Sequence, residues 1–359
     1  MKIAVLHNFM DNIGGAEYVD LILARELKAD IYTTNINYEK IKRMGFKKVN
    51  IQSIGKIPIN APFRQQLALQ RFRSLNLKNK YDLYIIAGDW AMSAAVNNKP
   101  NLWYVYSPIR EIYDLHNYVR QSLVSPIKRP LFDIWVKYNR YLNRKYIRHV
   151  EKIACISNNT KKRLKKYLNR DSTVIYPPTE TKNYKYKENG DFWLSVNRLI
   201  THKRVDMQIK AFKNLPNEKL IIVGSYEKSR HFKSYANYIK KIKPKNVEIL
   251  SWINQKELIN LYAGCKALIT TSKDEDYGLT PVEAMASGKP TIAPNEGGYK
   301  ETIINNITGK LINNINYKKL TKAVKSLKNP EQYKSACLKH AKNFDTKIFI
   351  KKIKELIKQ

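Results

Sequence analysis

The chain has 359 residues, 43% of them hydrophobic, which exceeds what one ordinary core contains and predicts two domains. Its 66 Lys and Arg against 30 Asp and Glu leave a formal charge of +36, which favours anionic partners such as phosphates, acidic lipids or nucleic acid. No apolar run reaches the about 20 residues that span a bilayer, and no secretory leader is visible, so we expect a cytoplasmic protein. Cys155, Cys265 and Cys337 lie too far apart for a zinc cluster and read as reduced core thiols.

Short β-branched runs alternate with helical stretches, a pattern typical of α/β proteins with parallel sheets. In the first half, strands are predicted at 3–7, 30–34, 49–54, 83–87, 102–106, 153–157 and 173–176. A polar stretch after Pro177-Pro178 predicts a linker, followed by strands at 192–196, 220–223, 247–250, 267–270 and 291–293. We therefore expect an N-terminal domain at 1–180, a second at 181–340, and a helix at 341–359 that packs back toward the first.

A basic helical insertion is predicted at about 109–150. Large apolar residues recur there at helical spacing, at Leu131, Ile134, Trp135, Tyr138, Leu142 and Tyr146, with Lys137, Arg140, Arg144 and Arg148 elsewhere around the helix. Such a helix either lies on an anionic membrane or packs on its own domain with a solvated basic face. The sequence leaves both interpretations open.

Residues 272–290 run from a strand end into a helix and contain two carboxylates eight positions apart, Glu275 and Glu283. Thr280 and Pro281 suit the N-cap and first position of the helix, which would make Glu283 a capping-box glutamate. A helix N-terminus beyond a strand also offers N–H groups to a phosphate, and Gly278 would let that phosphate approach closely. The two glutamates would then accept hydrogen bonds from sugar hydroxyls.

Two further segments follow the ends of predicted strands. Arg198 and Lys203 follow the first strand of the second half. Gly14-Gly15 follow the first strand of the chain and indicate a turn with close backbone approach.

The segment 272–290 resembles the E-x7-E motif of the retaining, family-four glycosyltransferases (glycosyl transferases group 1), and 198–203 resembles their R-L-x-x-x-K segment. The resemblance implies a GT-B architecture, two doubly wound Rossmann-like domains facing across a cleft, with the donor mainly on the second and the acceptor mainly on the first. It implies these donor-side residues: Gly14, Gly15, Arg198, Lys203, Trp252, Ile253, Glu275, Gly278, Leu279 and Glu283.

On the acceptor side, Tyr106-Ser107-Pro108-Ile109-Arg110 is similar to the H-S/T-P-M/V-R segment of a mannosyltransferase-like subgroup. Tyr106 stands where that subgroup has a functional histidine, and a tyrosine does not accept a proton readily near pH 7. His116 is an alternative proton acceptor, and Ser107 and Arg110 are further acceptor-side candidates. The resemblance implies catalytic roles for Glu275, Arg198, Lys203 and Tyr106.

The implied activity is metal-independent, retaining transfer of a hexose from a nucleotide sugar, with no cofactor. GDP-mannose is the favoured donor and a UDP-sugar the alternative; a glycan or lipid-linked acceptor is expected, at an anionic membrane surface if the basic insertion binds one. Asp274-x-Asp276 also fits a metal motif but lies inside the E-x7-E frame. Two alternatives remain: a sugar-nucleotide-binding protein impaired at Tyr106, and a basic nucleic-acid-binding protein, although no RNA-binding or zinc-finger signature is present and we expect no nucleic acid partner.

Overall fold

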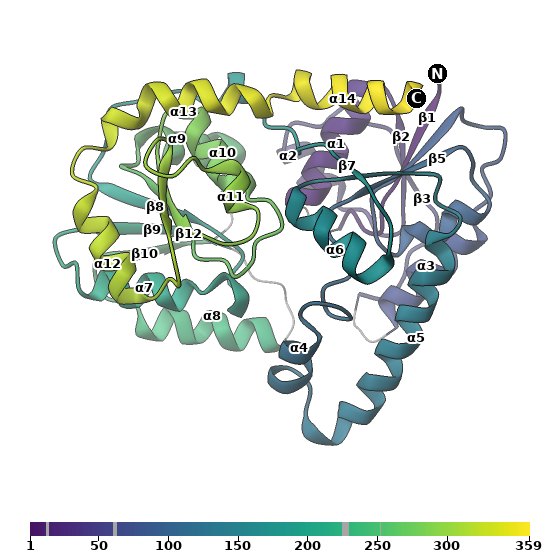
Figure 1. Cartoon of the computed structure of the whole chain (residues 1–359), viewed down its shortest axis with the longest axis horizontal. Coiled ribbons are helices and arrows are strands. Elements are labelled where there is room, and N and C mark those ends of the chain that lie inside the picture. The colour runs from purple at the N-terminus through teal and green to yellow at the C-terminus, as the bar shows by residue number, and fades with distance from the viewer. Residues whose placement is uncertain (12–13, 60–62, 225–229, 252) are drawn as a thin grey trace. The chain divides into compact units, whose positions relative to one another are not determined.

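The computed structural model describes residues 1–11, 14–59, 63–224, 230–251 and 253–359. The chain folds into two compact α/β units, the first formed by Met1–Tyr176 with Phe349–Gln359 and the second by Pro177–Ile348 (Figure 1). The boundary precedes residue 180 because Thr179 donates its N–H to Phe344 O (2.8 Å) and accepts from Thr346 N (3.2 Å). Residues 341–348 accordingly belong to the second unit, and the first unit receives only the residues from Phe349 onward.

The first unit contains a seven-stranded parallel sheet in the order β3-β2-β1-β4-β5-β6-β7. The strands are β1 Ile3–Leu6, β2 Asp30–Thr33, β3 Ile51–Ser53, β4 Leu83–Ile86, β5 Asn101–Val105, β6 Lys152–Cys155 and β7 Thr173–Val174. The helices are α1 Gly15–Leu27, α2 Tyr38–Arg43, α3 Arg64–Ser74, α4 His116–Ser122, α5 Arg129–Ile147 and α6 Asn158–Leu168. Strands β1 and β4 are buried throughout, as expected of the centre of a sheet covered on both faces.

The second unit contains a six-stranded parallel sheet in the order β10-β9-β8-β11-β12-β13. Its strands are β8 Phe192–Val196, β9 Lys219–Val223, β10 Val247–Leu250, β11 Leu268–Ile269, β12 Thr291–Pro294 and β13 Gly309–Ile312. Its helices are α7 Val205–Lys213, α8 Arg230–Ile242, α9 Gln255–Gly264, α10 Leu279–Ala286, α11 Tyr299–Thr302, α12 Tyr317–Ser326, α13 Lys334–Ala341 and α14 Thr346–Lys358. The last of these continues into the first unit.

Short 3-10 turns join several elements, at Ala91–Val96, Pro126–Lys128, Thr181–Asn183, Thr201–Lys203, Pro330–Tyr333 and Lys342–Phe344. Strand β13 was not predicted, because three of its four residues are only half-buried at the edge of the sheet. The three cysteines are buried free thiols. Within the described ranges, no helix is both long and apolar enough to cross a membrane.

The strand order reverses between β1 and β4 in the first sheet and between β8 and β11 in the second. In open parallel sheets, ligands bind outside the carboxyl ends of the strands at such a reversal, because the loops diverge there and leave a crevice. The predicted functional residues follow β1, β5, β8, β10 and β11, so they lie beyond the carboxyl ends of these strands.

The basic insertion forms two helices, α4 and α5, rather than one. The predicted apolar stripe straddles the boundary between two faces of α5. Leu142 and Tyr146 are buried in the core of the first unit, whereas Leu131, Ile134 and Tyr138 are exposed. Both the buried and the exposed face of α5 therefore carry apolar residues. Helical periodicity alone does not separate the two faces, so the sequence predicts a single stripe.

Candidate active site

The centre of the candidate site in the second unit is an ion pair between Lys203 and Glu275. Lys203 ends the 3-10 turn after β8, and Glu275 lies in the loop after β11; their Nζ and Oε2 atoms are 2.5 Å apart. Burial alone would raise the pKa of Glu275, but the Lys203 ammonium lowers it to about 2. Glu275 is thus a carboxylate at neutral pH, which can accept hydrogen bonds from the hydroxyl groups of a sugar.

The Glu275 loop is fastened to the turn before α11 through Gly297 and Gly298. The N–H of Gly298 donates to the carbonyl oxygen of Glu275 at 2.8 Å. A Cβ at Gly297 would lie 2.5 Å from the same oxygen, and one at Gly298 would lie 2.4 Å from Cα of Tyr277. The sequence analysis missed these glycines, although a Gly-Gly pair after a buried strand is a signal for close backbone approach.

Arg204 supports the same loop from the β8 side. Its φ of 51° is left-handed, and its guanidinium donates to the carbonyl oxygens of Thr271 (Nε, 2.5 Å) and Ser272 (Nη2, 3.1 Å). The guanidinium also forms an ion pair with Glu296. Arg204 is therefore a positioning residue beside Lys203, and the sequence analysis did not select it.

Helix α10 begins at Leu279, with Gly278 as its N-cap, and not at Pro281 with Thr280 as its cap as predicted. Gly278 has a φ of +97°, and a Cβ there would lie 2.9 Å from the ring of Tyr299. That left-handed residue starts the helix two positions earlier than expected. The first N–H groups of α10 still lie directly after the Glu275 loop, at an end that attracts anions.

Glu283 points away from the capping position that the sequence predicts. The hydroxyl of Tyr262 donates to its Oε2 at 2.6 Å, and Tyr184 packs edge-to-face on Tyr262. Burial raises the pKa of Glu283, while hydrogen bonds from the Tyr262 and Tyr184 hydroxyls lower it. The two tyrosines hold the Glu283 carboxyl group in one orientation.

The remaining donor-side residues lie beyond the carboxyl ends of β8 and β10. Arg198 is exposed two residues after β8, and Ile253 is half-buried three residues after β10. Gly224 directly follows β9, and a Cβ there would lie 2.8 Å from the carbonyl oxygen of Asn197, so the segments after β8 and β9 approach each other closely. Trp252 lies outside the described residues.

In the first unit, His7, Glu17, Asp20 and Tyr106 form a network at the carboxyl ends of β1 and β5. The Nδ1 atom of His7 lies 2.7 Å from Oδ2 of Asp20, and its Nε2 lies 3.3 Å from Oε1 of Glu17. The Tyr106 hydroxyl donates to Oδ1 of Asp20 at 2.5 Å. Burial opposes a charged imidazole, but the Asp20 and Glu17 carboxylates raise the pKa of His7 to about 10.

Tyr106 therefore does not act as a proton acceptor in this arrangement. Burial and the neighbouring Asp20 carboxylate hold its pKa well above the usual 10 of a tyrosine. Gly14, the N-cap of α1, donates its N–H to Oε2 of Glu17 at 2.7 Å, so the same network fixes the turn ahead of Gly15. His7, Glu17 and Asp20 were not predicted from the sequence.

The other acceptor-side candidates separate into two groups. Arg110 binds Asp114 through Nη2 and Oδ2 (2.8 Å), and Arg163, 3.7 Å from the same oxygen, donates to the Ser107 hydroxyl (3.2 Å). Ser107 and Arg110 thus belong to one cluster. His116 does not join it, because its Nε2 lies 3.5 Å from Asp133 in the α4–α5 segment.

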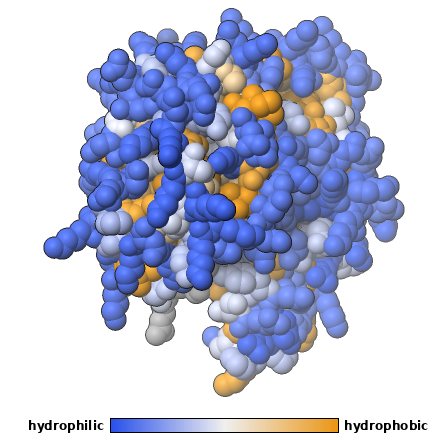
Figure 2. All heavy atoms as spheres, turned by 60° about the vertical axis from the view of Figure 1, so that its left-hand side comes forward, coloured by the Kyte–Doolittle hydropathy of each residue, from blue (hydrophilic) through white to orange (hydrophobic). Residues whose placement is uncertain are grey.

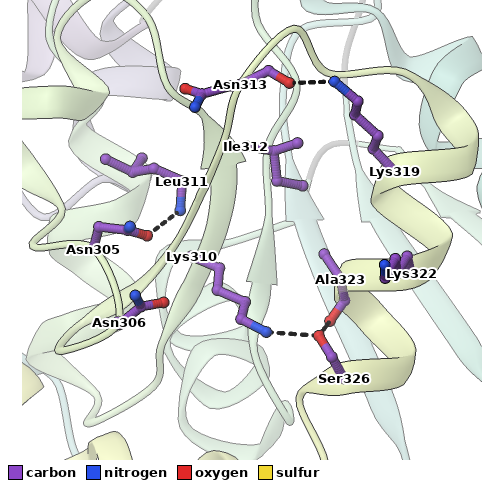
Figure 3. A pocket seen from close by; sticks show the side chains of 10 residues that line it. All are labelled: Asn305, Asn306, Lys310, Leu311, Ile312, Asn313, Lys319, Lys322, Ala323 and Ser326. Carbon is purple, nitrogen blue, oxygen red and sulfur yellow. Dashed lines mark hydrogen bonds between the residues drawn. The ribbon is translucent and has the colours of Figure 1, made fainter.

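A hollow of about 410 Å³ lies elsewhere in the second unit, between β13 and α12 (Figure 3). Its lining includes Lys310, which donates to Ser326, and Lys319, which donates to the carbonyl oxygen of Asn313. It contains none of the predicted donor-side residues, so we do not assign the donor to it. Within the described part of the chain, no three His, Cys, Asp or Glu side chains are grouped as a metal site would require.

The whole chain shares its fold with solved glycosyltransferases. Alr3699/HepE of Anabaena, in complex with UDP-glucose, superimposes with a TM-score of 0.77, covering 100% of this chain and 99% of that one at 18% identity. A sucrose-phosphate synthase of Thermosynechococcus elongatus superimposes with a TM-score of 0.74 at 16% identity, covering 100% and 98%. The two parallel-sheet units therefore have the GT-B fold.

Residues 178–344 match the family model of the glycosyl transferases group 1. An uncharacterized glycosyltransferase of Methanocaldococcus jannaschii is 30% identical over 58% of this chain and 58% of its own length. The alpha-1,3/1,6-mannosyltransferase ALG2 of Candida glabrata is 26% identical over 85% of this chain and 78% of its own. The O-antigen chain mannosyltransferase RfbU of Salmonella typhimurium is 26% identical over 58% and 65%. The second unit therefore resembles the group 1 glycosyl transferases over almost its whole length.

Proposed function

We propose that this protein transfers mannose from GDP-mannose to a glycan or lipid-linked acceptor, with retention of configuration and without a metal ion. The observation that carries the transferase activity is the Lys203–Glu275 pair beside the N-terminus of α10. Glu275 would bind hydroxyls of the donor sugar, and Lys203 with Arg198 would neutralise the charge that develops on the leaving diphosphate. These fixed cations take the place that a divalent ion would occupy on the diphosphate.

The choice of mannose depends on the relatives, several of which are named mannosyltransferases. Alr3699/HepE shares less than a quarter of its residues with this chain, so the UDP bound in its crystals does not decide which nucleobase the donor of this chain carries. The charge of +36 favours an acceptor presented at an anionic surface, hence a lipid-linked glycan at the inner face of a membrane.

The direct test is thermal stabilisation of the purified protein by GDP-mannose, UDP-glucose, GDP and UDP. We expect selective stabilisation by the GDP compounds that is weakened in Glu275→Gln, which removes the charge but keeps the shape. Transfer that persists in EDTA, and an α-linked product identified by NMR from an α-linked donor, would support the metal-independent and retaining parts. Stabilisation by UDP compounds alone would indicate a UDP-sugar donor in place of GDP-mannose. No stabilisation by any nucleotide would contradict the transferase proposal.

A second candidate is a protein that binds a sugar nucleotide but transfers the sugar slowly or not at all. The specific observation is the Tyr106 hydroxyl, which is committed to Asp20 where the related subgroup has a histidine. Donor binding at micromolar concentration without transfer or donor hydrolysis would favour this candidate. Multiple turnovers with any acceptor would exclude it.

A further inference from the structure

Helix α5 and the 3-10 turn before it carry a row of exposed apolar side chains that their own domain does not use. Ile127, Leu131, Ile134, Tyr138 and Tyr141, here called the outer stripe, are between 55% and 91% exposed. The last four are three, four and three positions apart, which places them along one side of α5, and Ile127 lies in the turn that leads into it. In Figure 2, apolar atoms lie at the tip of the lower projection, where Figure 1 shows the α4–α5 segment.

The outer stripe is not an unfinished part of the hydrophobic core. The opposite side of α5 already buries Val136, Leu142, Tyr146 and Ile147 in the first unit. An exposed row of large apolar residues on a helix that is otherwise packed indicates an interaction surface.

The α4–α5 segment is braced from within, so the outer stripe is formed before any partner arrives. Arg129 donates to the carbonyl oxygens of Arg120 (Nε, 3.1 Å) and Gln121 (Nη2, 3.2 Å), which closes the turn between the two helices. The His116 ring stacks on Phe132 at 5.7 Å. A preformed surface binds without the cost of ordering a loop.

The charges around the outer stripe are almost all positive. Residues 116–150 contain eight basic residues and one acid, Asp133; the basic residues are Arg120, Lys128, Arg129, Lys137, Arg140, Arg144, Lys145 and Arg148. Asp133 accepts from Nε of Arg120 at 2.9 and 3.0 Å, which holds its pKa low and cancels its charge locally. The exposed Lys137 and Lys145 extend the positive surface along the helix.

We propose that the outer stripe of α5 binds the surface of an anionic phospholipid bilayer. Aliphatic side chains enter the boundary between headgroups and acyl chains, tyrosines lie at that boundary, and lysines and arginines meet the lipid phosphates. Nucleic acid would satisfy the basic residues but would leave the aliphatic ones in water. This inference rests on the proposed function for its purpose: the Ser107–Arg110 segment leads directly into α4, so docking would bring the acceptor side to a lipid-linked acceptor.

The test is sedimentation of the full chain with vesicles of phosphatidylcholine alone or mixed with phosphatidylglycerol, at physiological and at high salt. We expect co-sedimentation with the anionic vesicles only, weakened by high salt. The Ile127→Ser, Leu131→Ser, Ile134→Ser triple variant should lose more than tenfold in partition coefficient. Lys137→Gln should lose roughly fivefold, since each basic residue near the surface contributes about that factor.

Matched controls place the same chemical changes elsewhere on the surface. Ile307→Ser removes an exposed isoleucine of the second unit, and Lys318→Gln removes an exposed lysine of α12; both should bind vesicles like the wild type. All variants should keep the wild-type nucleotide response in the thermal assay. The thermal assay therefore tests the proposed transferase function, and vesicle sedimentation tests the proposed membrane surface, independently of each other. Equal binding to neutral and anionic vesicles, no binding to either, or a dimer that the triple variant dissociates in light scattering would overturn the proposal.

Discussion

Gly298 is a position where one added methyl group tests how the Glu275 loop is held. A Cβ there would lie 2.4 Å from Cα of Tyr277 and 2.6 Å from the carbonyl oxygen of the same residue. Both are backbone atoms, so no change of rotamer relieves the contact. Since Cβ contacts essentially never fall below 3.0 Å, Gly298→Ala must shift the loop or the start of α11 by at least about 0.6 Å.

That shift acts on Glu275, two residues before Tyr277, and on its 2.5 Å contact with Lys203. Misplacement of a catalytic group by about 1 Å can cost 10²-fold in rate, and overpacking costs about 1–3 kcal/mol of stability. We expect nucleotide-sugar affinity to fall about tenfold, turnover to fall between ten- and a hundredfold, and the Tm to decrease. Calorimetric titration with the nucleotide sugar that stabilises the wild type measures the first effect.

Gly264→Ala is the control for this change. Gly264 ends α9 in the same unit, and a Cβ there meets nothing closer than 3.9 Å, an ordinary contact. It should bind the donor like the wild type. If Gly298→Ala did the same at an unchanged Tm, the glycine pair would not position Glu275 and the reasoning from backbone contact would be wrong.

Three further predictions concern charged groups. Lys203→Met removes the strongest of the interactions that oppose burial and leaves those of Ser272 and His202, so the pKa of Glu275 should rise from about 2, and donor binding measured against pH should weaken at a higher pH than in the wild type. His7 has a folded-state pKa of about 10 against about 6.5 unfolded, so its ion pair with Asp20 stabilises fully below pH 6.5 and is lost as pH rises through 10. His7→Gln should therefore lower the free energy of unfolding by about 3–5 kcal/mol in urea titrations near pH 6, with a smaller difference above pH 10. Tyr106→Phe should lower the free energy of unfolding by about 1.5–3 kcal/mol, because Asp20 loses a charge-assisted hydrogen bond. The transfer rate should change only a few-fold. Abolished transfer at unchanged stability would show that the Tyr106 hydroxyl does more than hold Asp20.

The fold class could be predicted because buried β-branched strands alternate with helices, and both parallel sheets are observed. Lys203 and Glu275 could be selected individually from their motifs. Their contact could not, because they are 72 positions apart and meet only since β8 and β11 are neighbours in the sheet. The helix start at Leu279 was missed because Gly278, with its left-handed φ, replaces Thr280 as the N-cap, and the close approach of Tyr299 from the following helix leaves no local signal.

The network around His7 was beyond sequence reasoning for the same physical reason. His7 directly follows β1, Asp20 lies inside α1 and Tyr106 directly follows β5, two places away from β1 in the same sheet. A buried histidine and a buried aspartate in separate elements give no local signal. Only the strand order brings the imidazole within 2.7 Å of the carboxylate.

The course of α14 has a consequence for the order in which the chain can fold during synthesis. Phe349, 2% exposed, packs on Tyr104 of β5, and Nζ of Lys152 donates to the carbonyl oxygens of Leu356 and Ile357. These residues leave the ribosome only after the whole second unit has been translated. The first unit therefore stays incomplete, with apolar surface uncovered, while the second is made, and it gains its final stability only after the second unit has been translated rather than domain by domain from the N-terminus.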